Sequence, residues 1–161
     1  MVIIVMGVTG TGKTTVGYRL AESLGWQFHD ADDFHPPANK AKMHAGIPLT
    51  DDDRWPWLRA LRAVIEQALD DKVGAVVTCS ALKRAYRDVL AGGLSQVRYV
   101  HLTGDPQVLA ARLAARSGHF MNPALLASQI ATLEAPADAI DVDVALTLDH
   151  QVAVIRRGLA L

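Results

Sequence analysis

The segment Gly-Val-Thr-Gly-Thr-Gly-Lys-Thr at residues 7–14 restricts the fold of this chain more than any other feature. It follows the apolar run Val2–Met6 and opens a stretch with helical spacing, Lys13–Leu24. Its glycines permit backbone angles and a close approach that a Cβ would block. The N–H groups of such a loop, with the start of the following helix, form a concave site for anions. We therefore expect phosphate to bind at Gly7, Val8, Thr9, Gly10, Thr11, Gly12, Lys13 and Thr14.

The last two residues of this segment carry side chains suited to a nucleotide. The amine of Lys13 can reach the β- and γ-phosphates, and the hydroxyl of Thr14 can ligate Mg²⁺. A chance glycine-rich turn rarely carries both residues between a buried-strand pattern and an amphipathic helix. The segment therefore predicts a site for a nucleotide with its magnesium ion.

Short apolar runs alternate with longer stretches of helical spacing along the whole chain. The expected strands are Val2–Met6, Trp26–His29, Val73–Cys79, Val97–Leu102 and Val142–Leu148. The expected helices are Lys13–Leu24, Trp57–Leu69, Ala81–Leu90, Pro106–Ala115, Pro123–Leu133 and Gln151–Gly158. This alternation is typical of βαβ units, and 161 residues suit one domain. We predict one α/β domain with a parallel sheet, helices on both faces, extra helix within Asp30–Trp57 and a loop at Arg116–Pro123.

Composition narrows the partners of the chain. Its 16 Lys and Arg nearly balance 17 Asp and Glu, whereas proteins that coat nucleic acid or anionic membranes normally carry a basic excess. No apolar run approaches the roughly 20 residues of a membrane span, and Gly7 ends the first run too early for a secretory signal. The single cysteine, Cys79, lies in an apolar run and is typical of a core residue in a reduced compartment. We expect a cytoplasmic protein without nucleic-acid or membrane partners.

Several classes of nucleotide-binding protein are disfavoured by the rest of the chain. A GTPase would read guanine with Asn-Lys-x-Asp, but the one Asn-Lys pair continues as Asn39-Lys40-Ala41-Lys42. Asp71-Lys72-Val73-Gly74 precedes an expected strand, so we interpret it as a turn. A motor or transporter ATPase would carry an acidic residue at the end of a long apolar strand, where this chain has Thr78-Cys79-Ser80. A small kinase fits the remaining pattern.

Acidic residues follow the second expected strand as Asp30-Ala31-Asp32-Asp33. The carboxyl edge of an open parallel sheet is where ligands bind. Phosphoryl transfer requires charge neutralisation, alignment and a carboxylate that accepts the hydroxyl proton. Asp30 and Asp32 are therefore candidates for metal binding and for the general base. A helix cap or a solvated turn is the alternative interpretation of the pair.

The segments around this acidic pair resemble one kinase family over nearly the whole chain. The matching elements after the second strand are Asp30-x-Asp32, His35-Pro36, Asn39, Lys42-Met43, Gly46-x-Pro48-Leu49 and Asp51-Asp52-Asp53-Arg54-x-Pro56-Trp57-Leu58. Further matches are Cys79-Ser80-Ala81-Leu82-Lys83, Tyr86-Arg87-Asp88, Arg112-Leu113-x-x-Arg116-x-Gly118-His119-Phe120 and Thr132-Leu133-Glu134 with Pro136. Together with the phosphate loop, this pattern resembles the gluconate kinases (gluconokinases).

The resemblance implies ATP-dependent phosphorylation of D-gluconate to 6-phospho-D-gluconate, with ATP and Mg²⁺ as cofactors. It also implies the P-loop fold of shikimate and nucleoside monophosphate kinases, with five parallel strands in one domain. A helical substrate-binding insert would span about residues 31–57, and a lid would span about residues 116–123, with Gly118 helping it to bend. The family further suggests a homodimer.

Individual roles follow from the same resemblance. Asp30 would bind Mg²⁺ through water, beside Thr14, and Asp32 would be the general base, although the sequence leaves the reverse order open. Arg116 would contact the ATP phosphates, and Arg112 would lie over adenine unless it forms a salt bridge along its helix. The expected substrate contacts are His35, Asn39 and Lys42 for hydroxyl groups, Arg54, Lys83 and Arg87 for the carboxylate, and Ser80 and Gln129.

Two other functions stay open at this point. The chain could be another small-molecule kinase of the same fold, with shikimate, a nucleoside monophosphate or another sugar acid as the acceptor. It could also be a nucleotide-binding regulatory domain without catalysis. The helix after the lid carries no arginine that could reach shikimate, and Lys42 and Arg87 could equally be charges of a helix surface.

Overall fold

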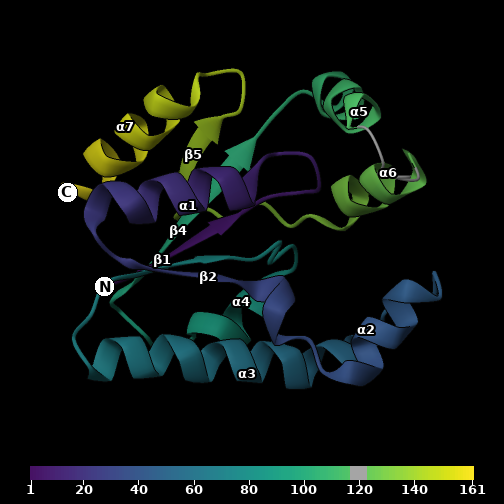
Figure 1. The fold of residues 1–161 in the computed structure, drawn as a ribbon, viewed down its shortest axis with the longest axis horizontal. Coiled ribbons are helices and arrows are strands. Elements are labelled where there is room, and N and C mark those ends of the chain that lie inside the picture. The colour runs from purple at the N-terminus through teal and green to yellow at the C-terminus, as the bar shows by residue number, and fades with distance from the viewer. Residues whose placement is uncertain (117–122) are drawn as a thin grey trace.

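A computed structural model describes residues 1–116 and 123–161 of the chain. Its centre is a five-stranded sheet in the order β2-β3-β1-β4-β5, and every neighbouring pair of strands is parallel (Figure 1). The strands are β1 (Val2–Met6), β2 (Gln27–Asp30), β3 (Ala75–Thr78), β4 (Val97–Thr103) and β5 (Ile140–Asp143). The helices are α1 (Lys13–Leu24), α2 (Pro37–His44), α3 (Asp51–Asp70), α4 (Arg84–Ala91), α5 (Pro106–Ala115), α6 (Pro123–Thr132), α7 (Leu148–Leu159) and the short 3₁₀ helix η1 (Ala31–Phe34). The predicted α/β class is confirmed.

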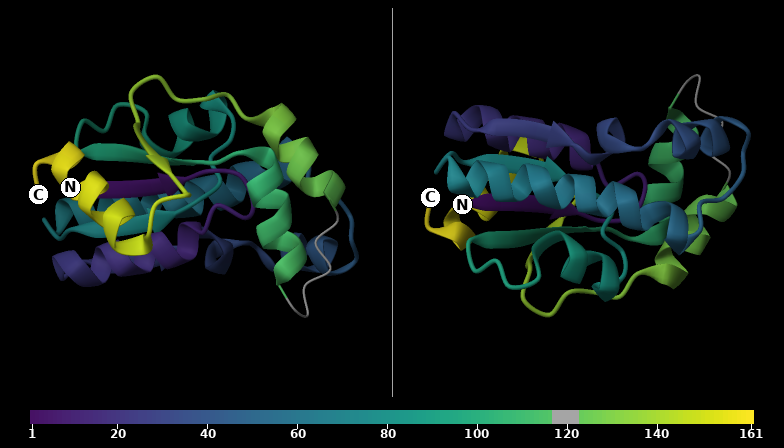
Figure 2. Two further views of the ribbon diagram at one scale, coloured as in Figure 1. Left: turned by 90° about the horizontal axis from the view of Figure 1, so that it is seen from above. Right: turned by 90° about the horizontal axis from the view of Figure 1, so that it is seen from below.

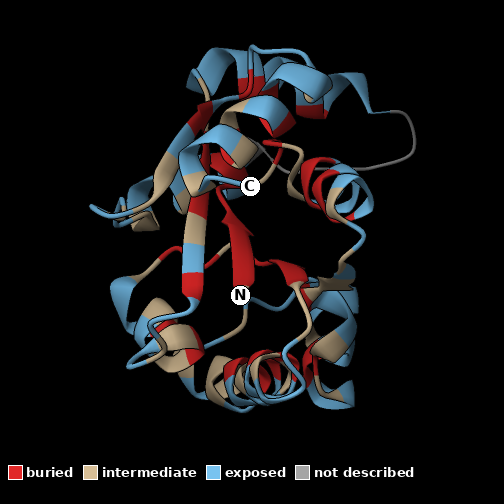
Figure 3. Cartoon of the chain, turned by 90° about the vertical axis from the view of Figure 1, so that its left-hand side faces the viewer, coloured by how far each residue is buried: buried red, intermediate tan, exposed pale blue. Residues whose placement is uncertain are grey.

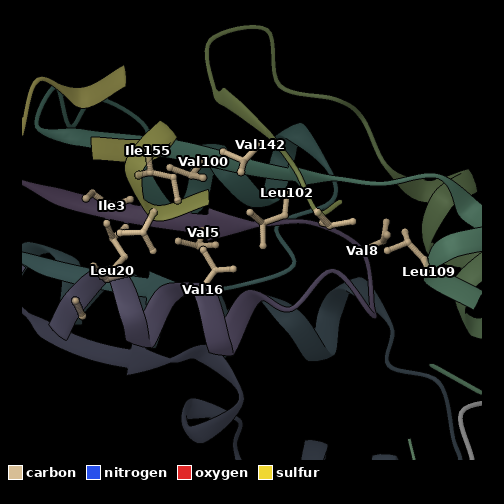
Figure 4. Close-up of a cluster of buried hydrophobic side chains, with 14 of the residues drawn as sticks. Ile3, Val5, Val8, Val16, Leu20, Val100, Leu102, Leu109, Val142 and Ile155 are labelled. Atoms are coloured by element: carbon tan, nitrogen blue, oxygen red, sulfur yellow. The ribbon is translucent and has the colours of Figure 1, made fainter. Parts of the chain in front are cut away.

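Helices cover both faces of the sheet because its strands are apolar on both sides. Successive side chains of a strand point to opposite faces. In β1, Ile3 and Val5 join one buried cluster with α1 and α7, which Figure 4 shows at close range. Val2, Ile4 and Met6 join a second cluster with α3 and α4. The sheet is therefore the middle of three layers, and its central strand is buried throughout (Figures 2 and 3).

The carboxyl ends of β1, β2 and β3 meet at one edge of the sheet, away from both termini. α2, α5 and α6 lie at this same end of the molecule (Figures 1 and 2). α1 approaches β3 closely here, since a Cβ at Gly17 would lie 2.5 Å from Cγ2 of Thr78. This close packing directs the start of α1 and the loop before it toward the ends of β2 and β3.

Several expected elements begin or end at different residues in the structure. The last strand, expected at Val142–Leu148, ends at Asp143, whose carboxylate accepts a hydrogen bond from the N–H of Ala145 at 2.8 Å and so forms a turn. Thr147 then caps α7, which begins at Leu148 instead of Gln151. The run 142–148 was misleading because its later apolar residues belong to a turn and a helix start.

The second expected helix, Trp57–Leu69, begins earlier than its pattern indicates. Thr50 and Asp53 form a capping box, so α3 starts at Asp51 and carries Pro56 in its interior. The helix expected from Ala81 begins instead at Arg84, because Ala81 has a left-handed backbone with φ of 46°.

The remaining sequence expectations concern the insert, the lid and the membrane. Residues 31–57 contain η1, α2 and the first turns of α3, as expected of a helical insert. The expected lid, including Gly118, falls on residues 117–122, which lie outside the described part of the chain. Within that part, none of the helices combines the length and the apolar character needed to cross a membrane.

Candidate active site

A cavity of about 400 Å³ opens at the carboxyl edge of the sheet. It joins residues from the phosphate loop, the start of α1, the ends of β2 and β3, α2, α6 and the residue after α5. Its lining comprises Thr9, Gly10, Gly12, Lys13, Thr14, Thr15, Asp30, Asp32, Met43, Thr78, Cys79, Ser80, Arg116, Leu125 and Gln129. All four residues predicted to be catalytic, Lys13, Asp30, Asp32 and Arg116, therefore face one space.

The glycines of the phosphate loop let its backbone adopt a shape that other residues would disfavour. Gly10 and Gly12 have φ of +84° and +85°, a backbone conformation that residues with a Cβ disfavour. The hydroxyl of Thr11 and the amine of Lys13 donate to the carbonyl of Val8 over 2.8 Å and 3.1 Å. The loop thus closes on itself before α1 begins. Burial lowers the pKa of Lys13 below the ordinary value for lysine.

Asp30 accepts hydrogen bonds at both of its carboxylate oxygens. The hydroxyl of Thr14 donates to Oδ2 over 2.9 Å, and the N–H of Asp32 donates to Oδ1 over 3.0 Å. Asp30 therefore caps η1, as the alternative interpretation proposed, and also faces the start of α1. Burial raises the pKa of Asp32 above its ordinary value, and the neighbouring charge of Asp30 raises it further.

The Thr14–Asp30 pair suits Mg²⁺ by its chemistry. Mg²⁺ keeps several water ligands and is usually bound by one or two carboxylates together with substrate phosphates. A hydroxyl and a carboxylate 2.9 Å apart beside the phosphate loop provide such oxygen donors. The described residues contain no group of three or more His, Cys, Asp or Glu side chains that could hold a metal ion. The donor set fits a metal that arrives with a nucleotide.

Cys79 lines the cavity but is not a nucleophile. Its side chain is buried, and this burial raises the pKa of its thiol to about 12. Cys79 also belongs to the core cluster between the sheet and α3. The thiol therefore stays protonated, in agreement with the expected core role.

His35 and Asn39 are buried within the insert. The ring of His35 stacks on Trp57 at 4.1 Å, and its Nδ1 lies 3.3 Å from Nδ2 of Asn39. Nδ2 of Asn39 also donates to the carbonyl of Asp53 over 2.9 Å. These contacts join η1, α2 and α3, so both side chains already have partners within the fold.

Lys42 is also engaged with α3. Its amine contacts both oxygens of Asp53, at 2.9 Å and 2.8 Å. The hydrogen bond from Lys42 is the largest cause that lowers the pKa of Asp53 to about 2. The pair therefore fixes the far end of α2 against the capping box of α3.

Arg54 and Lys83, two of the three expected carboxylate partners, converge on Asp51. Their nearest contacts to its oxygens are 3.1 Å and 3.4 Å, and the hydroxyl of Tyr86 donates to it as well. This last hydrogen bond is the largest cause that lowers the pKa of Asp51. Arg54 and Lys83 also lie 5.7 Å and 5.5 Å from the centre of the Tyr86 ring. We name Asp51, Arg54, Lys83 and Tyr86 the Asp51 cluster.

The sequence prediction missed Asp51 and Tyr86 as members of this site. Each lies three residues from a predicted cation, Asp51 before Arg54 and Tyr86 after Lys83, which places the two side chains of each pair within reach on a helix face. That spacing was the available indication. It could not show that α3 and α4 bring the two pairs together.

Arg87, the third expected carboxylate partner, lies apart from this cluster. Its guanidinium donates to the carbonyls of Ala81, Leu82 and Glu134 over 2.9, 3.2 and 2.8 Å. It lines a second cavity, of about 490 Å³, which the phosphate loop does not reach. The structure thus separates Arg87 from the other predicted site residues.

Two of the predicted contacts beyond β4, Arg112 and Gln129, also have partners in the fold. Arg112 donates to the carbonyl of Val144 over 2.7 Å, instead of forming a salt bridge along α5. Oε1 of Gln129 accepts a hydrogen bond from the N–H of Thr9 over 2.7 Å. Ser80 and Arg116 line the cavity beside them.

Comparisons with known proteins identify the family of this chain. A family model described as shikimate kinase matches residues 9–137. The gluconokinase of Gluconobacter oxydans is 52% identical over 84% of this chain and 76% of its own length. The thermosensitive gluconokinase of Escherichia coli is 43% identical over 93% of this chain and 80% of its own length.

Solved structures show which similarity indicates the family and which indicates only the fold. A gluconokinase from Sinorhizobium meliloti superposes with a TM-score of 0.85 at 48% identity, covering 98% of this chain and 90% of that one. A shikimate kinase from Bacteroides thetaiotaomicron superposes with a TM-score of 0.69 at 17% identity, covering 100% and 99%, and shares the fold alone. Because these gluconokinases are 43–52% identical to most of this chain, the resemblance found in the motifs is confirmed: this chain is a P-loop kinase of the gluconokinase family.

Proposed function

We propose that the protein transfers the γ-phosphoryl group of ATP to the 6-hydroxyl of D-gluconate, releasing ADP and 6-phospho-D-gluconate. The observation that carries this proposal is that one cavity contains both the phosphate loop and Asp32, a carboxylate whose pKa is raised. Family membership supports the choice of acceptor, since the similar proteins are named gluconokinases.

The phosphate loop and Lys13 would hold the phosphates of ATP, with Arg116 facing them from the end of α5. Mg²⁺, held by Thr14 and by Asp30 through water, would neutralise the charge of these phosphates. Phosphoryl transfer requires positioning and charge stabilisation more than covalent help from the protein. The cavity offers both, because its cations and its carboxylates face each other.

Asp32 would accept the proton of the 6-hydroxyl. The alcohol oxygen then forms a bond to the γ-phosphorus, the bond from that phosphorus to the β–γ bridging oxygen breaks, and ADP leaves with the electron pair. A carboxylate of raised pKa is a better proton acceptor than an ordinary aspartate. The contact of Asp30 with Thr14 and the raised pKa of Asp32 favour this division of roles over the reverse order.

The Asp51 cluster supports an acidic acceptor. Two cations, Arg54 and Lys83, surround one carboxylate, so the cluster keeps a net positive charge that a substrate carboxylate could neutralise. Arginine has five N–H donors, of which Arg54 uses few within the described residues. His35 interacts electrostatically with both Asp32 and Arg54. A polyol with its alcohol at Asp32 and its carboxylate at Arg54 and Lys83 fits this arrangement, with Ser80 as a further hydroxyl partner.

The test is an assay of ADP release coupled to NADH oxidation, with Mg-ATP and a panel of acceptors. The panel contains D-gluconate, shikimate, AMP, glucose and glycerate, and Asp32→Asn is the control variant. Turnover on D-gluconate that is lost in the variant supports the proposal. Turnover on another acceptor alone would keep the kinase and change its substrate. ATP binding without any turnover would favour a regulatory domain.

We also propose that the chain works as one cytoplasmic domain, with residues 31–57 as its substrate-binding insert and residues 116–123 as its lid. The family suggests a homodimer. Light scattering on the eluate of a sizing column measures the mass in solution, and a mass of one chain at assay concentration would exclude the dimer.

A further inference from the structure

One side chain of α6 contacts the backbone of the phosphate loop. The N–H of Thr9 donates to Oε1 of Gln129 over 2.7 Å, although the two residues lie 120 positions apart. Both residues line the cavity that also contains Lys13, Asp32 and Arg116. This contact therefore joins the ATP side of the site to the helix that covers it.

The chemistry of the contact determines how the Gln129 amide is oriented. A backbone N–H only donates, so the amide oxygen, and not the amide nitrogen, must face Thr9. The planar amide then directs its two N–H donors away from Thr9. Within the described residues, no protein acceptor takes a hydrogen bond from this nitrogen. The amide oxygen of Gln129 thus accepts from the loop, while its two N–H groups stay available to donate to a phosphate oxygen.

The other end of α6 is joined to the acceptor side of the site. The N–H of Glu134 donates to the carbonyl of Leu82 over 2.9 Å, and its carboxylate accepts from the N–H of Arg84 over 2.6 Å. The guanidinium of Arg87 donates to the carbonyl of Glu134 over 2.8 Å. These contacts hold the connection between β3 and α4, which carries Ser80 and Lys83. The segment from Gln129 to Glu134 therefore links the phosphate loop to the acceptor-binding residues.

We infer that Gln129 is a positioning residue for phosphoryl transfer, fixing Thr9 through its oxygen and directing its N–H donors at the γ-phosphate. This inference rests on the proposed kinase function. Thr9 already donates its N–H to Gln129, so that N–H is not needed to hold the nucleotide. The loop's remaining N–H groups, from Gly10 to the start of α1, form the site for the inner phosphates. Gln129 should therefore affect transfer and the γ-phosphate, but not the binding of ADP.

Two variants separate these effects. Gln129→Met keeps the length of the side chain but removes the acceptor and the donors. Gln129→Glu keeps an acceptor for Thr9 but replaces the donors with a negatively charged oxygen. Ser128→Ala, an exposed neighbour on α6, is the matched control. Titration calorimetry with ADP and with a non-hydrolysable ATP analogue, steady-state kinetics and thermal unfolding are measured for all four proteins.

We expect Gln129→Met to lower kcat about 100-fold, as a small misplacement of the reacting groups does, while Kd for ADP stays unchanged. We expect Gln129→Glu to weaken binding of the ATP analogue but not of ADP, because the new charge meets only the γ-phosphate. An unchanged kcat in Gln129→Met, or an equal loss of affinity for ADP and the ATP analogue, would overturn the inference.

Two further controls keep the result clear. Thermal unfolding identifies a variant that loses activity only because it no longer folds, and such a variant is replaced by Gln129→Asn under the same criteria. If the wild-type protein turns over no acceptor, the proposed function fails, whereas the two nucleotide titrations still test the contact of Gln129 with the γ-phosphate.

Discussion

The hydroxyl of Thr14 donates a hydrogen bond to Oδ2 of Asp30 over 2.9 Å, joining the start of α1 to the end of β2. The same carboxylate caps η1 through its other oxygen. Asp30 therefore connects the phosphate loop to the segment that carries Asp32. One carboxylate can serve both roles because its two oxygens face different partners.

This geometry predicts a specific defect for Asp30→Asn. The amide keeps an oxygen that can cap η1, but it loses the charge that attracts a divalent cation. We expect the Mg²⁺ concentration for half-maximal rate to rise, and chelation of Mg²⁺ to abolish turnover in both proteins. Titration of Mg²⁺ at fixed ATP measures the effect. Asp33→Asn, at an exposed neighbour, is the control, and equal Mg²⁺ dependence in all three proteins would contradict the assignment.

Asp32→Asn should remove most activity. Loss of a general base typically lowers kcat by about 10²–10⁴-fold. Because burial raises the pKa of Asp32, the wild-type rate should fall with decreasing pH at a higher pH than an ordinary aspartate would give. The rate profile of the wild type between neutral and acid pH measures this. A profile without such a step in kcat/KM would argue against Asp32 as the base.

The same raised pKa predicts a gain in stability for Asp32→Asn. A folded-state pKa above the unfolded value means that the ionised carboxylate opposes folding. The variant should therefore unfold at higher denaturant concentration than the wild type at neutral pH. The difference should shrink as pH falls through the raised pKa and vanish below the ordinary value of 3.8. Urea titrations at several pH values test this, with Asp33→Asn as the reference.

Lys83→Met and Arg54→Met should weaken binding of gluconate. One charge-assisted hydrogen bond contributes about 1.5–3 kcal/mol, so KM for gluconate should rise roughly 10- to 100-fold. KM for ATP should stay unchanged, because the Asp51 cluster does not line the phosphate cavity. Arg59→Met, at an exposed position of α3, is the matched control. An equal rise in both KM values would show that the cluster supports the fold and not the acceptor.

Gly17→Ala should destabilise the protein although alanine favours helices. The new Cβ would lie 2.5 Å from Cγ2 of Thr78 and 3.2 Å from Cε2 of Phe28. Such overpacking costs about 1–3 kcal/mol of unfolding free energy. Thr78→Ser removes the Cγ2 methyl, so Gly17→Ala should cost less in that background. A double-mutant cycle in urea measures the coupling, and purely additive effects would reject this contact as the cause.

The local pattern of residues was sufficient for the elements that form the catalytic edge. β1 and α1 begin and end where the apolar run and the helical spacing predict, with the phosphate loop between them. Asp30 and Asp32 lie at the end of β2, as expected from the strand before them. Patterns succeed here because a strand buried on both faces and a helix with one apolar face each leave a regular trace in the sequence.

Only the tertiary structure determined which groups the side chains of the site contact. Arg54 and Arg87 are the same residue type within matching motifs, yet Arg54 faces Asp51 while Arg87 is held by backbone carbonyls. Gln129 contacts Thr9, and Arg112 contacts Val144, across long stretches of chain. The sequence by itself therefore determined the fold class, the phosphate loop and the acidic edge. Only the packing of distant segments decided that Arg54 and Lys83 meet at Asp51 while Arg87 lies apart. A side chain's partners depend on the elements that meet around it and not on its neighbours along the chain.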